Sequence, residues 1–82
     1  MKNLLIVEDS FIDLNNFIPL FLRKGFNVLI TRSGAEALKI IEHSPPDIIL
    51  LDVILPDISG FNVCQKIKQK AATQKIPVVI CS

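Results

Sequence analysis

Short apolar runs alternate with longer amphipathic stretches along the chain, and this alternation predicts strands separated by helices. The runs at residues 4–7, 47–53 and 76–82 are largely apolar, whereas residues 26–31 alternate apolar and polar positions. Nearly continuous apolar runs are typical of parallel strands that are buried on both faces, while alternation indicates a more exposed strand. We therefore expect four strands, with residues 26–31 at an edge of the sheet.

The first amphipathic stretch predicts a helix between residues 10 and 25. Ser10 is suited to the N-cap position, and Gly25 supplies a C-terminal stop. Pro19 lies inside this helix and removes one backbone donor, so we expect a kink there.

Two further helices are predicted from local signals. Ser33 and Glu36 form a capping box at the start of the second helix, which we expect to stop before the prolines at residues 45–46. The third helix is expected over residues 61–70. Its predicted buried stripe consists of Phe61, Cys64 and Ile67. The aromatic residues are interpreted as core residues, and they are Phe11, Phe17, Phe21, Phe26 and Phe61.

The resulting order of elements is β-α-β-α-β-α-β, which favours an α/β fold with a doubly wound parallel sheet. Right-handed crossover connections place helices on both faces of such a sheet. Ligands bind outside the carboxyl ends of the strands in this class. The residues directly after each apolar run are therefore the candidates for function.

Composition and charge restrict the kind of protein. The chain has 82 residues, half of them hydrophobic, so we expect one small domain with a packed core. Nine Lys and Arg nearly balance eight Asp and Glu without blocks of like charge, which argues against direct nucleic-acid or membrane-surface binding. The apolar runs are far shorter than the roughly 20 residues that span a membrane, and the N-terminus resembles no signal peptide. We expect a cytoplasmic protein.

Acidic side chains follow two of the predicted strands and make the strongest chemical signal. Glu8 and Asp9 follow the first strand, and Asp52 lies at the end of the third. If these strands are neighbours, three carboxylates converge and repel one another, so a cation is expected. Hard oxygen ligands favour Mg²⁺, and the single histidine, His43, argues against zinc. An aspartate beside a dication is a competent nucleophile toward phosphorus.

Other polar residues have simpler interpretations. Asp57 is read as a turn residue and Ser10 as a helix cap. His43 falls in the last turn of its helix, where a cation interacts favourably with the helix dipole. The two cysteines, Cys64 and Cys81, fit neither a disulfide framework nor a metal signature, so we read them as small hydrophobes.

Three motifs in this order give the chain its resemblance to a known family. They are EDS at residues 8–10, LLDVILPDISG at residues 50–60 and IPVVICS at residues 76–82. Together they closely resemble the receiver domain of two-component response regulators, over the whole of residues 1–82. The resemblance implies a flavodoxin-like sheet with strand order 2-1-3-4.

The resemblance also implies roles for individual residues. Asp52 would be the phosphoacceptor, phosphorylated by a sensor histidine kinase or a phosphotransfer protein. The implied Mg²⁺ ligands are Glu8, Asp9, Asp52 and the backbone carbonyl of Ile54. Ser82 matches the switch hydroxyl of the family, and Pro56 and Gly60 match the loop that leads into the third helix. Their restricted and permissive backbone dihedrals suit that loop.

The resemblance implies further elements that the printed chain does not hold. Receiver domains continue after the fourth strand with a helix, a fifth strand and a final helix, so we expect residues 1–82 to be a partial domain. The catalytic lysine of the family lies on that fifth strand and has no counterpart here. The fourth strand, with Val78, Val79 and Ile80, then becomes an unpaired apolar edge, and we expect a homo-oligomer joined through it.

Other function classes fit the sequence less well. An aspartate-nucleophile phosphatase needs a second acid two residues after Asp52, where Ile54 stands, and a nucleotide-binding domain needs glycines in place of Glu8 and Asp9. We expect no enzyme beyond catalysis of the domain's own phosphorylation and dephosphorylation. The remaining alternative is a receiver fragment that cannot be phosphorylated and acts as an interaction or self-association module.

Overall fold

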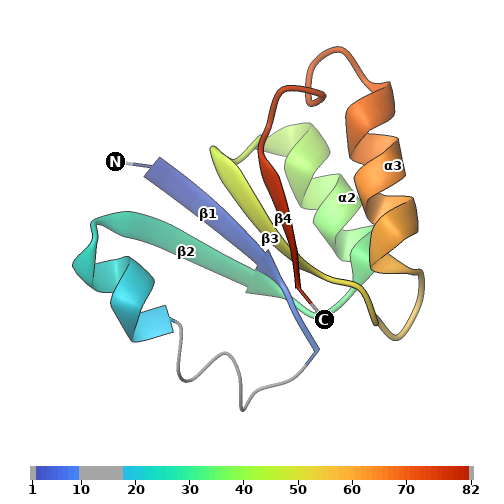
Figure 1. Cartoon of the computed structure of the whole chain (residues 1–82). Coiled ribbons are helices and arrows are strands. Elements are labelled where there is room, and N and C mark those ends of the chain that lie inside the picture. The colour runs from blue at the N-terminus through green and yellow to red at the C-terminus, as the bar shows by residue number, and fades with distance from the viewer. Residues whose placement is uncertain (1, 10–17, 82) are drawn as a thin grey trace.

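The computed structural model describes residues 2–9 and 18–81 (Figure 1). In chain order the elements are β1 (Lys2–Val7), β2 (Phe26–Thr31), α2 (Gly34–His43), β3 (Ile48–Asp52), α3 (Gly60–Gln69) and β4 (Val78–Cys81). Residues 18–23 are also helical, as the first predicted helix requires. The expected cap at Ser10 lies outside the described residues, so the start of that helix stays a prediction.

The four described strands form one parallel sheet in the order β2-β1-β3-β4. This order confirms the predicted fold class and places β2 at an edge. The central pair is β1 and β3, in which Val7 lies opposite Leu51. No helix in the described part of the chain is both long and apolar enough to cross a membrane.

Apolar side chains of the sheet point to both faces and form two cores. On one face α2 and α3 cover the sheet (Figure 1), and the buried residues there are Leu5, Val7, Ala37, Ile41, Ile49, Leu51, Val63 and Ile67. On the other face Ile18 and Phe21 pack against Leu4 and Ile6. Phe21 also meets Phe26 edge-on, with ring centroids 5.9 Å apart. Burial on both faces explains why the strands read as continuous apolar runs.

Half of the predicted capping box at the start of α2 is confirmed, because the Ser33 N–H donates to Oγ1 of Thr31 at 3.3 Å and not to the Glu36 side chain. The Ser33 side-chain oxygen accepts a hydrogen bond from the Glu36 backbone N–H at 3.2 Å. This bond satisfies one of the N–H groups that have no acceptor within the helix. The helix ends at His43, whose side chain lies in the last turn as expected.

The predicted buried stripe of α3 is confirmed at Ile67, is partly buried at Cys64 and is wrong at Phe61. The buried residues are Gly60, Val63 and Ile67, whereas Phe61 is 60% exposed and Cys64 is only partly buried. The helix begins at Gly60, whose backbone packs against the end of β3, and the next residue is turned about 100° away from the sheet. Phe61 is therefore a surface residue and not part of the core. Phe21 and Phe26 are partly buried, and Phe11 and Phe17 lie outside the described residues.

Candidate functional site

The carboxyl ends of β1 and β3 bring the predicted acidic residues onto neighbouring strands. Asp52 is the last residue of β3, and Glu8 directly follows Val7, which lies opposite Leu51. The Glu8 N–H donates to the Thr31 carbonyl at 3.0 Å, so residue 8 still runs beside β2. Neighbouring strands lie about 4.8 Å apart. The backbones of Glu8 and Asp52 are therefore side by side at one edge of the sheet.

The side chains at this edge are not gathered around a single point. Glu8 and Asp52 are half-buried and Asp9 is exposed. Within residues 2–9 and 18–81, no three His, Cys, Asp or Glu side chains lie close enough together to hold a metal ion. The convergence of three carboxylates is thus not seen in this conformation, although the donor set of carboxylate and carbonyl oxygens fits the chemistry of Mg²⁺. The metal site stays a prediction.

Asp52 has one hydrogen bond that orients its carboxylate. The backbone N–H of Ile54 donates to Oδ1 of Asp52 at 3.3 Å. No other hydrogen bond to the Asp52 carboxylate is found among the described residues. The side chain of Ile54 is 77% exposed and does not take part in this contact.

Gly60 lies against the backbone of Asp52 because it has no side chain. A Cβ atom at position 60 would overlap the carbonyl oxygen of Asp52 and come within 2.8 Å of the Val53 Cα. The Gly60 N–H also donates to the Val53 carbonyl at 2.8 Å, which closes the loop of residues 53–59 behind Asp52. The predicted reason for this glycine, a permissive dihedral, is wrong, because a positive φ occurs among the described glycines only at Gly25. Close approach is the requirement, and Pro56 lies exposed within the same loop.

Asp57 has a role that the sequence interpretation as a turn residue missed. Its carboxylate accepts hydrogen bonds from the backbone N–H of Gly34 (2.9 Å), the backbone N–H of Ala35 (2.9 Å) and the Ser33 hydroxyl (3.0 Å). The hydrogen bonds from the Ala35 N–H, which has the largest effect, and from the Gly34 N–H hold the pKa of Asp57 well below its ordinary value. The partners are 22 to 24 residues away along the chain. No local signal around position 57 could have identified them.

The end of β4 lies beside Asp52, because Cys81 is its register partner on that strand. Ser82, the predicted switch hydroxyl, comes next in the chain but lies outside the described residues. Its role stays a prediction.

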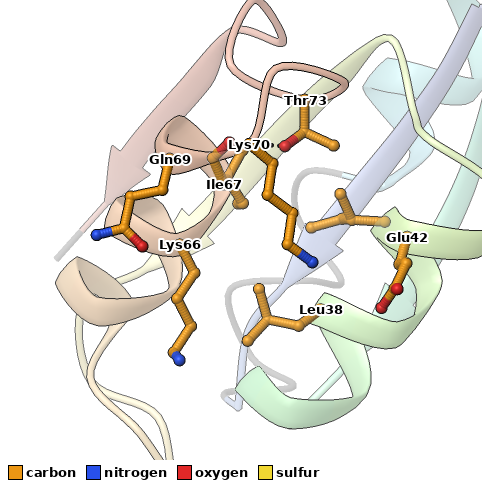
Figure 2. A pocket seen from close by; sticks show the side chains of 8 residues that line it. Leu38, Glu42, Lys66, Ile67, Gln69, Lys70 and Thr73 are labelled. Atoms are coloured by element: carbon orange, nitrogen blue, oxygen red, sulfur yellow. Dashed lines mark hydrogen bonds between the residues drawn. The ribbon is translucent and has the colours of Figure 1, made fainter.

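A groove of about 280 Å³ runs between α2 and α3, away from this edge (Figure 2). Lys66 and Lys70 stand on the α3 wall, and Leu38 and Glu42 stand on the α2 wall. Glu42 lies in the last turn of α2 and Lys70 at the C-cap of α3, so the groove lies between the carboxyl-terminal halves of the two helices. None of the predicted site residues lines it.

Comparison with known proteins decides the family. The sequence model of the response regulator receiver domain matches residues 4–82. This chain belongs to the response regulator receiver domain family. Receiver domains are signalling modules of two-component systems rather than conventional enzymes, they bind Mg²⁺ in their active site, and they interact with histidine kinases.

Individual receiver proteins are similar to this chain over most of its length. The polar-differentiation response regulator DivK of Brucella ovis is 37% identical over 78 residues, which are 95% of this chain and 63% of DivK. The structure of the phosphorylated cyanobacterial phytochrome response regulator RcpA is 31% identical, with a TM-score of 0.91 over 96% of this chain and 63% of that one. The Mn²⁺-bound form of response regulator Rcp1 is 34% identical, with a TM-score of 0.83 over 98% of this chain and 64% of that one. The chain thus spans somewhat less than two thirds of these relatives.

Proposed function

We propose that residues 1–82 are part of one receiver domain in which Asp52 accepts a phosphoryl group from a sensor histidine kinase or a phosphotransfer protein. The observation that carries this proposal is the position of Asp52. It ends the strand β3 of a receiver-family sheet, beside Glu8, which directly follows β1. Pairing with β1 on one side and β4 on the other fixes the backbone of β3 there, and the one hydrogen bond to the Asp52 carboxylate among the described residues goes to Oδ1.

The proposed reaction is a displacement at phosphorus. Oδ2 of Asp52 forms a bond to phosphorus while the bond from phosphorus to the imidazole nitrogen of the donor breaks. The imidazole leaves with the electron pair of that bond and takes up a proton from solvent. The Ile54 N–H keeps Oδ1 occupied and so directs Oδ2 toward the donor. The phosphorylated state of RcpA, a relative at 31% identity, supports this assignment.

Glu8, Asp9, Asp52 and the carbonyl of Ile54 would hold Mg²⁺ at this edge. A dication bound there would neutralise part of the carboxylate charge, which otherwise repels an anionic phosphoryl group. The three carboxylates and the dication leave a net charge of about −1, which permits the approach of an anion. The Mn²⁺-bound form of Rcp1, at 34% identity, supports a divalent cation.

Ser82 would couple the phosphoryl group to the end of β4. It follows Cys81, whose backbone lies opposite Asp52, and a hydroxyl there would donate to a phosphoryl oxygen. The phosphorylated form would thereby differ from the free form at the end of β4. The cytoplasmic location stays a prediction.

Phosphorylation is tested with the 82-residue chain itself. We expect incubation with Mg²⁺ and a small acyl-phosphate donor to add one phosphoryl group, measured by intact-protein mass spectrometry. Asp52→Asn should abolish the mass gain, and Asp9→Asn should reduce it. Asp47→Asn is the matched control, since Asp47 is an exposed acid at the start of β3 that accepts from the Asn3 N–H. An unmodified wild-type spectrum would contradict the proposal.

A second proposal concerns the 82-residue chain as printed, and it is self-association through β4. This strand is the last of the described sheet, and Val79 and Ile80 on it are 46% and 39% exposed. An apolar edge with unpaired backbone groups favours pairing with another strand. We expect light scattering to give a dimer or larger species, and Val79→Lys to return a monomer. Leu22→Lys, a change at an exposed leucine outside the sheet, is the control, and a monomeric wild type would refute the proposal.

A further inference from the structure

The loop after Asp52, residues 53–59, is attached to the rest of the molecule at two points. At its base the Gly60 N–H donates to the Val53 carbonyl. On its far side Asp57 accepts hydrogen bonds from Ser33, Gly34 and Ala35 at the amino end of α2. The loop that follows the proposed phosphoacceptor is therefore fastened to a different helix from the one it leads into.

The second attachment uses groups that have no alternative partner. The N–H groups of Gly34 and Ala35 belong to the first turn of α2, where the helix itself offers no acceptor. A carboxylate that accepts two backbone N–H groups at 2.9 Å makes charge-assisted hydrogen bonds, which are stronger than neutral ones. The Asp57 side chain thus accepts hydrogen bonds from the first N–H groups of α2 and at the same time holds its own loop against that helix.

Packing beside Asp57 reinforces this attachment. A Cβ atom at Gly34 would meet side-chain atoms of Ile58 and would lie 3.0 Å from Cγ2 of Val63. The absence of a side chain at Gly34 therefore lets Ile58, the neighbour of Asp57, pack directly on the backbone of α2. The polar and apolar contacts fix the same part of the loop.

Ile54 is the residue of this loop that touches Asp52. Its N–H donates to Oδ1 of Asp52 at 3.3 Å, and residues 55 and 56 are all that separate it from Asp57. A shift of the loop would carry Ile54 away, because one long hydrogen bond does not hold it alone.

We propose that Asp57 is a positioning residue for Asp52, which holds the loop against α2 and so keeps the Ile54 backbone next to the Asp52 carboxylate. Its effect on phosphorylation rests on the proposed function. The attachment itself does not, and it is measured separately. Asp57 touches neither the donor nor the reacting atoms, so its removal should change the rate through the geometry of the loop.

The test compares Asp57→Ala with Ser33→Ala in the full 82-residue chain. Ser33→Ala removes the Ser33–Glu36 cap and one Asp57 partner, but Asp57 keeps its two backbone donors. It is therefore a matched control that weakens α2 and leaves the loop attached. We expect amide hydrogen exchange at Ile54 and Gly60 to rise about tenfold in Asp57→Ala and to stay within about twofold of wild type in Ser33→Ala.

The second readout is the initial rate of labelling by the acyl-phosphate donor at saturating Mg²⁺. Asp57→Ala should lower this rate about tenfold and Ser33→Ala by less than about twofold. Asp57→Asn keeps one acceptor oxygen and should restore part of the rate. If Asp57→Ala does not fold, Asp57→Asn provides the same comparison with a smaller expected change.

The outcomes separate the two proposals. Equal exchange at Ile54 in the Asp57 and Ser33 variants would overturn the positioning role, whatever the rates show. Faster exchange with an unchanged labelling rate would also overturn it. A wild-type chain that takes no phosphoryl group would refute the proposed function, and the exchange experiment would still decide whether Asp57 holds the loop.

Discussion

The two loops that flank α3 are each held by one charged side chain, but the attachments differ in reach. Residues 53–59, before α3, are held by Asp57, whose partners on α2 lie 22 to 24 residues away. Residues 70–77, after α3, are held by Lys68, which donates to the carbonyls of Gln74 (3.1 Å) and Ile76 (2.6 Å). These partners are only six and eight residues away. Asp57 thus ties the loop beside Asp52 to a different helix, while Lys68 ties the other loop to the helix that it follows; the Pro77 carbonyl at the end of that loop also accepts from the Ile49 N–H of β3 at 3.0 Å.

This difference predicts which substitutions should change the site around Asp52 and which should change only the stability of the fold. A change in residues 70–77 removes local hydrogen bonds at the amino edge of the sheet, far from Asp52. A change in residues 53–59 alters the contact between this loop and α2 and the backbone next to Asp52. Loss of stability should therefore accompany both kinds of change, and an altered site should accompany only the second.

The largest expected effect is that of Gly60→Ala, at the base of the loop beside Asp52. The added methyl group would overlap the Asp52 carbonyl oxygen, so backbone must move, and we expect a loss of about 3 kcal/mol in the free energy of unfolding. Gly25→Ala is the control, because nothing lies near a Cβ there and only its positive φ is strained, at a cost of about 1 kcal/mol. Urea unfolding measures both, and equal costs would contradict the close approach at Gly60.

The next effect is a pH dependence from Asp57. Its pKa is lowered in the folded chain by the Ala35 and Gly34 N–H groups, so the unfolded chain binds a proton at a higher pH than the folded chain does. The stabilisation is therefore complete above the ordinary aspartate pKa of about 3.9 and is lost as pH falls below it. Wild type should lose more stability than Asp57→Asn between about pH 5 and pH 2. Parallel curves from urea unfolding at each pH would show that Asp57 is not held as described.

A smaller effect is expected from Thr73→Val in the loop after α3. The Thr73 hydroxyl donates to the Ile67 carbonyl at 2.6 Å, and the side chain is only 4% exposed. Its loss leaves a buried carbonyl without this donor, at a cost of about 1 to 2 kcal/mol in unfolding free energy. Thr73→Ser keeps the hydroxyl and should cost less. Amide exchange at Ile54 should not change in either variant, and a change there would break the distinction between the loops.

The smallest effect is expected from Lys68→Met. It removes two hydrogen bonds made by an exposed side chain, so the cost in unfolding free energy should be about 0.5 to 1 kcal/mol. The labelling rate at Asp52 should equal that of wild type. A rate that falls as it does in Asp57→Ala would show that the two loops are coupled.

The sequence pattern was sufficient for the sheet and for the backbone positions of the site. Parallel strands buried on both faces leave continuous apolar runs, so the strands could be located, and the acidic residues that end them had to share one edge. Strand ends differ from the prediction by one or two residues, as at β3, which spans Ile48–Asp52 rather than 47–53. The residue at which a strand ends depends on how far the neighbouring strands continue to pair with it, which the local pattern does not show.

The pattern of apolar and polar residues could not predict contacts between segments that are far apart in the sequence. Phe61 is a large apolar residue of the kind usually found in a core. It is exposed because the preceding residue, Gly60, packs against the end of β3 and so turns position 61 away from the sheet. Asp57 stands in a turn sequence, but its partners are set by how α2 packs beside the loop. Both errors arise because the sequence around a residue does not show which residues of a distant element will pack against it.

The most direct test of the account is whether Glu8, Asp9 and Asp52 bind one divalent cation. Substoichiometric Mn²⁺ added to the ¹⁵N-labelled chain broadens amide signals near the ion, and excess Mg²⁺ should reverse this by competition. We predict that the signals of Asp9, Asp52 and Ile54 broaden first and that Asp52→Asn weakens the effect. Broadening that begins instead around Glu42, or no broadening at all, would contradict the assignment of this edge as the active site.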